Sequence, residues 1–180
     1  IMLGSLSLGK VMLSPLEVLR ILLSSQDASL TFIVEQLRLP RTLLAALVGA
    51  ALSVSGLILQ SIIRNPLASP DLLGITSGAS AAAVLYLSFF SVALGQQYLP
   101  LAAMSGAGLA ALAIYLLAWK QGASPLRLVL IGVGISAMLT AATTFILVFS
   151  PLTTTLSAYV WLTGSVYGAS WPEPLALGGW

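Results

Sequence analysis

Four long stretches of the chain, residues 43–63, 75–93, 99–119 and 128–149, contain no charged side chain. A transmembrane α-helix needs about 20 consecutive, mostly apolar residues to cross the hydrocarbon layer of a bilayer. Each stretch therefore predicts one membrane-spanning helix. Together they predict an all-α fold, a polytopic transmembrane helical bundle.

The composition excludes the main alternatives to a membrane protein. Hydrophobic residues make up 58% of the chain and charged residues 7%, whereas a soluble domain carries about 25% charged residues. So few charges cannot cover a water-facing surface, and so hydrophobic a chain is not intrinsically disordered. The net charge of +2 comes from too few groups for a nucleic-acid interface. We expect a lipid bilayer around this chain and no nucleic-acid partner.

The residue types present also exclude several kinds of chemistry. Histidine and cysteine are absent from the sequence, which removes the usual zinc ligands and the cysteine and histidine nucleophiles. No G-x-x-x-x-G-K-[ST] motif occurs, so ATP hydrolysis at a phosphate-binding loop is not expected. The predicted spans lack charged residues, which argues against a proton relay or a charged-ring channel. We expect no catalytic residue, cofactor or metal, and a transporter of this kind would need energy from a partner.

The parts outside the four stretches divide the chain into three regions. Residues 1–42 are expected to hold the end of an earlier span and two interfacial helices, one starting at Ser14 with Glu17 reaching back as in a capping box. Residues 43–149 would hold the four spans, and residues 150–180 an outer loop and the start of another span. Because both ends break off within apolar segments, we expect the chain to be part of a larger polytopic protein.

Basic residues in the connecting loops predict the orientation. The loops on one face hold Arg64, Lys120 and Arg127, whereas the loops at 94–98 and 150–170 hold no basic residue. The positive-inside rule places the first set in the cytoplasm and leaves Arg38 and Arg41 on the outer face. Two interpretations of these two arginines stay open. Their long side chains snorkel to the interface, or they dock an acidic partner outside the membrane.

Small side chains recur along one face of the first predicted span. Gly49, Ser53, Gly56 and Gln60 follow one another at steps of four, three and four residues. Small residues let helices approach closely in a membrane, so helix packing is the first interpretation for Gly49, Ser53 and Gly56. An amide such as that of Gln60 needs a partner inside the bundle or a water-filled path. Gln60 is therefore a packing residue or a pathway residue.

A second strip of small and hydroxyl residues runs along the last predicted span. It consists of Gly132, Ser136, Thr140 and Thr144, spaced four residues apart. Serine and threonine in a helix can bond their own backbone carbonyls, which allows a packing role. A strip along a whole span is also what a polar pathway through a bundle would need. Ser136, Thr140 and Thr144 are thus candidates for lining a pathway, with packing as the alternative.

Several motifs, in order along nearly the whole chain, resemble the permease family of the FecCD type, whose members import iron–siderophores, haem and cobalamin. The first is Arg38-Leu39-Pro40-Arg41, followed by the small-residue run at 49–56. A loop with Asn65, Pro66, Leu67, Ala68, Pro70 and Gly74 is similar to the signature loop of that family. The segments 131–134 and 161–165 and Trp171 extend the resemblance.

The resemblance implies a fold and a set of partners. Members of the family have ten transmembrane helices in the bacterial inner membrane and work beside a second permease subunit, identical or related. Two cytoplasmic ATPase subunits drive them, and a periplasmic or lipid-anchored substrate-binding protein delivers the chelate. The resemblance thus implies a permease subunit of an ATP-driven importer for an iron–siderophore, haem or cobalamin-like chelate. A non-transporting module of packed helices is the alternative.

The same resemblance implies roles for particular residues. It gives Arg38 and Arg41 the docking of carboxylates on the binding protein. It places the inner gate at Ser124, Pro125 and Leu126, where Pro125 and Leu126 depart from the more polar version of the cobalamin importer. It also implies a short helix near the outer mouth, at residues 158–164. A permease of this family performs no covalent chemistry.

Overall fold

The structure, a computed structural model, describes residues 2–9, 11–23, 28–66, 68–119 and 124–179. These residues form helices and turns without a β-strand, as predicted. They fall into two compact units. Unit 1 combines Ile1–Ser53 with Ser165–Trp180, and unit 2 is Val54–Gly164. The C-terminal segment is thus grouped with the N-terminal one, and the division into three membrane regions stays a prediction.

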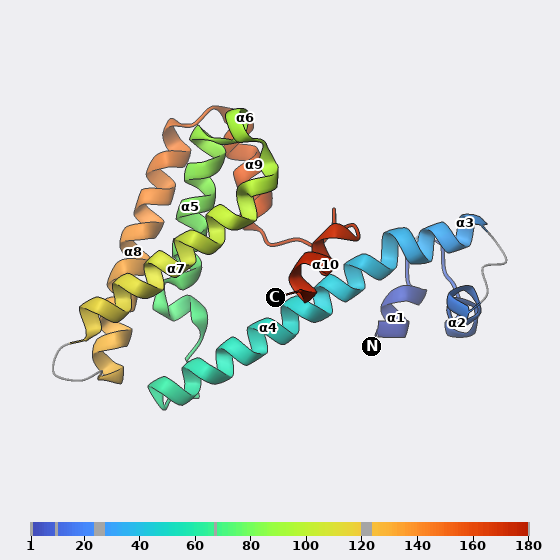
Figure 1. Ribbon diagram of the computed structural model, residues 1–180, viewed down its shortest axis with the longest axis horizontal. Helices are drawn as coiled ribbons and strands as arrows, with labels where there is room; N and C mark the ends of the chain where they lie inside the picture. Colours follow the sequence, from blue (N-terminus) through green and yellow to red (C-terminus); the bar gives the residue numbers. More distant parts are fainter. Residues whose placement is uncertain (1, 10, 24–27, 67, 120–123, 180) are drawn as a thin grey trace. The chain divides into compact units, whose positions relative to one another are not determined.

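Unit 1 is built from short helices around the first part of a long one (Figure 1). Its elements are α1 (Met2–Ser7), α2 (Pro15–Leu23), α3 (Ala28–Thr31), a π-helical segment (Phe32–Arg38), the first half of α4 (Leu39–Ile63) and α10 (Pro172–Gly178). The predicted capping box begins α2. The Ser14 N–H donates to Glu17 Oε2 at 2.7 Å, and the Glu17 N–H donates to Ser14 Oγ at 3.2 Å. Val18 and Val34 lie at the centre of a small apolar core.

The second expected interfacial helix is continuous with the first predicted span. Residues Ala28–Ile63 form one helical stretch, although Pro40 lies within it. Proline has no amide hydrogen and breaks a regular helix interior. Here the N–H of Leu39 donates to the carbonyl of Val34, five residues back, so a widened π-helical turn precedes the proline. The prediction of two separate helices was wrong at this point, because the π-helical turn accommodates Pro40.

Unit 2 holds the other helices (Figure 1). In addition to the end of α4, it contains a 3₁₀ turn (Pro70–Leu73), α5 (Ile75–Phe89), α6 (Ser91–Leu94), a second 3₁₀ turn (Gln96–Tyr98), α7 (Leu99–Ala118), α8 (Pro125–Phe149) and α9 (Leu152–Leu162). α5 packs against both α7 and α8. The core between them centres on Ala83 and Val84, which are fully buried. The short helix expected at 158–164 is α9, which begins six residues earlier.

Glycines allow α5 and α7 to cross at backbone distance. A Cβ atom on Gly78 would lie 2.6 Å from the carbonyl oxygen of Gly106, and a Cβ on Gly106 would meet Ala82 and the carbonyl of Gly78. Any side chain at either position would push the helices apart. This is the close approach through small residues that membrane helices use, in the second and third predicted spans rather than the first.

Three helical stretches in the described residues are long and apolar enough to cross a membrane: Ala28–Ile63, Gln96–Ala118 and Pro125–Phe149. The remaining predicted span, 75–93, is a 15-residue helix, α5, followed by the separate α6. The helix is interrupted at Phe90, and the Ser91 hydroxyl donates to the Leu87 carbonyl at 2.6 Å. At 1.5 Å per residue α5 is about 22 Å long, shorter than a hydrocarbon layer of about 30 Å.

Candidate functional site

Arg38 and Arg41, the two predicted docking residues, lie where the π-helical segment meets α4. The guanidinium of Arg38 donates from Nη1 to the Leu6 carbonyl and from Nη2 to the Val11 carbonyl, each at 2.6 Å. A Cβ on Gly9 would come within 2.7 Å of Nη2, so the N-terminal segment wraps closely around this cation. Arg38 therefore ties the end of α1 and the following turn to the start of the long helix.

Arg41 has a different environment in the same unit. Its Cζ atom lies 5.2 Å from the centroid of the Tyr167 ring, within the range of a cation–π contact. Its Nε atom is buried and has no hydrogen-bond partner among the described residues. Tyr167 is 79% exposed, so the ring that holds Arg41 also faces outward. Sequence reasoning missed Tyr167, because no spacing rule relates two residues so far apart in the chain.

The signature loop is folded back onto the end of α4. The Gln60 side chain donates from Nε2 to the Pro66 carbonyl at 3.0 Å, and the Asn65 N–H donates to the Gln60 carbonyl at 3.2 Å. The Ala68 N–H closes the turn onto the Asn65 carbonyl at 3.1 Å. Leu67 lies outside the described residues. The structure thus gives the Gln60 amide a partner in the loop, and its role in packing or in a pathway stays a prediction.

Gly74 ends the signature loop where backbone meets backbone. Its φ of +74° lies in the left-handed region, and a Cβ there would be 3.0 Å from both Gly132 O and Ser136 N of α8. Pro70 begins the 3₁₀ turn that leads into this contact. Only glycine combines this conformation with so close an approach. The loop therefore determines how α5 starts against α8.

The polar strip of α8 divides into two parts. Gly132 is buried beneath the signature loop, and Ser136 Oγ is hydrogen-bonded to Ser77 Oγ of α5 at 2.8 Å. Thr140 and Thr144 are exposed, and the Thr144 hydroxyl donates to the Thr140 carbonyl at 3.0 Å. Each step of four residues turns the face by about 40°, so the strip rotates away from α5 as it rises. Ser136 therefore packs against α5, whereas the two threonines are exposed in the described part of the chain.

The small-residue face of α4 is uncovered in the described part of the chain. Gly49 and Ser53 are exposed, and no atom outside the helix lies within 4 Å of a Cβ built on Gly49 or on Gly56. The Ser53 hydroxyl donates to the Gly49 carbonyl at 2.7 Å. The packing partner expected for Gly49, Ser53 and Gly56 is therefore not among the described residues, and their packing role stays a prediction.

The predicted inner gate forms the start of α8. Ser124 is the extended residue before the helix, Pro125 occupies its first position, and the Leu128 N–H donates to the Ser124 carbonyl at 3.0 Å. Proline suits this position because its amide nitrogen needs no partner there. Leu126 is 70% exposed and therefore free to face another subunit. The geometry is compatible with a constriction but does not itself form one.

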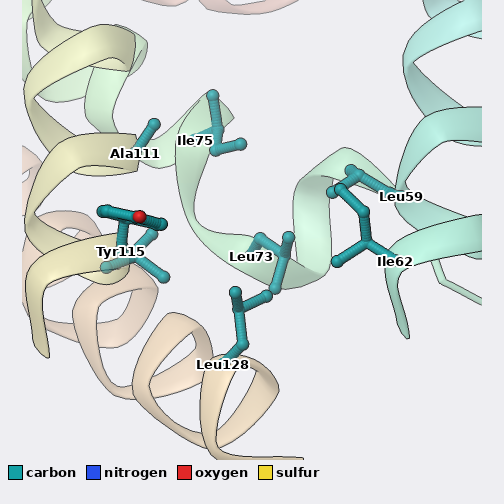
Figure 2. A pocket seen from close by; sticks show the side chains of 8 residues that line it. Leu59, Ile62, Leu73, Ile75, Ala111, Tyr115 and Leu128 are labelled. Carbon is teal, nitrogen blue, oxygen red and sulfur yellow. The ribbon is translucent and has the colours of Figure 1, made fainter. Parts of the chain in front are cut away.

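An apolar cavity of about 130 Å³ lies beside the signature loop in unit 2. Figure 2 shows side chains from α4, the 3₁₀ turn, the start of α5, α7 and α8 around it. Its lining residues are Leu59, Ile62, Leu73, Ile75, Ala111, Ile114, Tyr115 and Leu128. Small-molecule sites measure about 300–1,000 Å³ and carry several placed polar groups. The cavity is therefore too small and too apolar to hold a charged chelate, and no cluster of metal-binding side chains occurs in the described residues.

The sequence profile of the FecCD transport family matches residues 1–180 of this chain. The achromobactin transport system permease protein CbrC of Dickeya dadantii is 73% identical over 180 residues, which are 100% of this chain and 52% of that protein. The iron(3+)-hydroxamate import system permease protein FhuG of Bacillus subtilis is 40% identical over 173 residues, 93% of this chain and 52% of that protein. The chain thus spans about half the length of these relatives.

A solved structure agrees with the sequence matches. It is an inward-facing conformation of a metal-chelate type ABC transporter, and its TM-score to this chain is 0.81 at 29% sequence identity. The alignment covers 97% of this chain and 52% of that one. The fold described above, with the signature loop and both arginines, is therefore similar to the fold of a transporter of this type.

Proposed function

Because this chain belongs to the FecCD transport family, we propose that the whole protein is the permease subunit of an ATP-driven importer for an iron–siderophore chelate. The observation that carries the proposal is the 73% identity, along the entire chain, to a permease named for achromobactin transport. Ferric achromobactin is accordingly the first chelate to test. Cobalamin is the next, since a relative 41% identical over 143 residues is named for cobalamin import, and haem is included because the sequence motifs resemble those of haem importers too.

The proposal includes the partners that such an importer needs. A second permease subunit would complete the pathway, two cytoplasmic ATPase subunits would supply the energy, and a periplasmic or lipid-anchored binding protein would deliver the chelate. The permease would be located in the bacterial inner membrane, and the three long apolar helices support this location. The permease itself would perform no covalent chemistry, and ATP hydrolysis would take place on the separate subunits.

Arg38 and Arg41 would meet acidic groups on the binding protein. The structure supports this role by holding both cations at one place on unit 1, Arg38 through two backbone carbonyls and Arg41 over an aromatic ring. Two donors of the Arg38 guanidinium are used by carbonyls of the described residues, and the side chain keeps its full charge. Complementary charge of this kind gives an interface its orientation and association rate.

Chelate would then pass along the exposed hydroxyl residues of α8. Thr140 and Thr144 point away from the α5 contact, unlike Ser136, so they are the members of the strip that a pathway can use. Ser124, Pro125 and Leu126 would narrow the inner end. ATP binding and hydrolysis would alternate the exposure of this pathway between the two sides of the membrane.

Uptake and docking can be tested separately with the full-length permease. Cells that lack its gene should lose uptake of radioactive ferric achromobactin and regain it from a plasmid. The double variant Arg38→Glu, Arg41→Glu should lower the affinity of the permease for the binding protein of the same gene cluster by about tenfold or more at low salt. The salt dependence of this affinity should disappear. Arg20→Glu, which reverses the charge of one arginine on α2, is the control. Unchanged uptake of every ferric chelate after gene deletion would instead support the non-transporting module.

A further inference from the structure

The proline of the Arg38-Leu39-Pro40-Arg41 motif leaves one backbone carbonyl open. In the π-helical segment the Leu39 N–H donates to the Val34 carbonyl, five residues back. The next donor in that register would be Pro40, opposite the carbonyl of Glu35, and proline has no N–H. The indole N–H of Trp171 donates to this Glu35 carbonyl at 3.0 Å. A side chain from the C-terminal segment thus takes the place of the missing amide.

The segment that carries Trp171 is itself held in shape. The Glu173 carboxylate accepts hydrogen bonds from the backbone N–H and the hydroxyl of Ser170, both at 2.9 Å. These bonds close the turn around Trp171. Farther up the segment, the Tyr167 N–H donates to Ser165 Oγ at 3.1 Å. Two hydrogen-bonded turns therefore hold Tyr167 and Trp171 in position within their own segment.

Tyr167 contacts the motif at Arg41, the residue that follows Pro40. The Arg41 Cζ atom lies 5.2 Å from the centre of this ring, and Nε is buried without a hydrogen-bond partner in the described part of the chain, so the ring helps to orient the guanidinium. An aromatic ring and a guanidinium attract each other at this distance without fixing the N–H donors. Such a contact uses none of the Nη donors, which are the groups that an incoming carboxylate would bind.

We propose that residues 165–173, which we call the outer brace, form one wall of the surface that docks the substrate-binding protein. In the brace, Tyr167 and Trp171 are positioning residues for Arg41. The proposal rests on the docking role of Arg41 given under the proposed function. Trp171 sets the helical turn that carries the motif, and Tyr167 sets the direction of the arginine. The partner surface that fits is a carboxylate flanked by a group that packs on the exposed edge of Tyr167.

Binding of the substrate-binding protein to the complete transporter in lipid nanodiscs tests the brace. Tyr167→Leu removes the ring and should weaken binding by about two- to fivefold, the value of an exposed cation–π contact. Tyr167→Phe keeps the ring and should bind like the unchanged protein. Trp171→Phe keeps the packing, loses the indole N–H, and should also weaken binding. Trp161→Phe, a tryptophan on α9 outside the brace, is the matched control and should have no effect.

A double-mutant cycle distinguishes positioning from general damage. If Tyr167 acts through Arg41, Tyr167→Leu should weaken binding no further once Arg41→Ala is present, because the residue that it positions is gone. Fully additive effects, or a Tyr167→Leu protein that binds normally, would overturn the proposal while leaving the docking role of Arg41 intact. Normal binding by Arg41→Ala alone would overturn the docking role itself, and the brace with it.

Discussion

Arg38 and Arg41 are three residues apart and have unlike surroundings, so their substitutions should differ. Arg38→Ala opens the carbonyls of Leu6 and Val11, and we expect the N-terminal segment to lose about 1–3 kcal/mol of local stability, since each bond has a charged donor. Hydrogen exchange of residues 4–13 should rise accordingly in the full-length protein. Arg38→Lys should restore little of it, because one ammonium lacks the two-pronged geometry of a guanidinium.

Arg41→Ala is the matched control for Arg38. It removes the same charge three residues farther along the same helical stretch, and among the described residues Arg41 donates no hydrogen bond to a backbone carbonyl of the N-terminal segment. Exchange at residues 4–13 should therefore stay unchanged. Equal exchange in the two alanine variants would contradict the tether that we assign to Arg38.

Glu17 makes the first turn of α2 sensitive to pH. Hydrogen bonds from the backbone and then the side chain of Ser14 lower the pKa of the Glu17 carboxyl below its ordinary value. Because the pKa is lowered in the folded protein, the cap stabilises α2 fully at a pH above the ordinary pKa of glutamate. This stabilisation is lost as the pH falls through the lowered pKa of Glu17. Below about pH 4 the first turn should fray, seen as faster amide exchange after correction for the intrinsic rate. Glu17→Gln should abolish the pH dependence, and a response that persists in it would have another origin.

At the scale of helices, the α5–α7 crossing offers a matched pair of glycines on one helix. A Cβ at Gly106 would collide with Ala82 and with the Gly78 backbone, whereas in the described part of the chain nothing lies within 4 Å of a Cβ at Gly108. Gly106→Ala should therefore destabilise unit 2 by about 1–3 kcal/mol, the usual cost of overpacking. Gly108→Ala should be neutral or stabilise by up to about 1 kcal/mol through helix propensity. Thermal unfolding in detergent measures both, and equal effects would refute the close crossing.

Local signals in the sequence predicted the elements that local interactions determine. The capping box at Ser14 follows from neighbouring residues alone and is present, whereas α8 begins at Pro125, three residues before the predicted start of the span. The π-helical turn before Pro40 could not be predicted, because proline normally signals a helix end. The split of the α8 strip also depends on a partner far away in the chain, since the bond from Ser77 to Ser136 crosses 59 residues.

That split predicts different reactivity along α8. Thr140→Cys should react with a water-soluble thiol reagent if a polar pathway passes it, whereas Ser136→Cys should be protected by its contact with Ser77. Met138→Cys is the control, because Met138 is 65% exposed in this chain but carries no hydroxyl and would face lipid or another helix. The signal is specific when the full-length protein has no other cysteine. Equal inertness of all three would favour packing over a pathway.

The orientation of the whole molecule decides whether the docking surface can meet its partner. The positive-inside rule places Leu126 in the cytoplasm with Arg127, and Gln97 and Gly168 outside. Gly168 is exposed and adjacent to Tyr167, so it reports the side of the membrane on which the Arg41 contact lies. A membrane-impermeant thiol reagent added to intact spheroplasts should therefore label Gln97→Cys and Gly168→Cys but label Leu126→Cys only after the membrane is opened. Labelling of Gly168→Cys only from the cytoplasmic side would place both arginines away from any extracytoplasmic binding protein. The docking role and the outer brace would then both be lost, whatever the substrate.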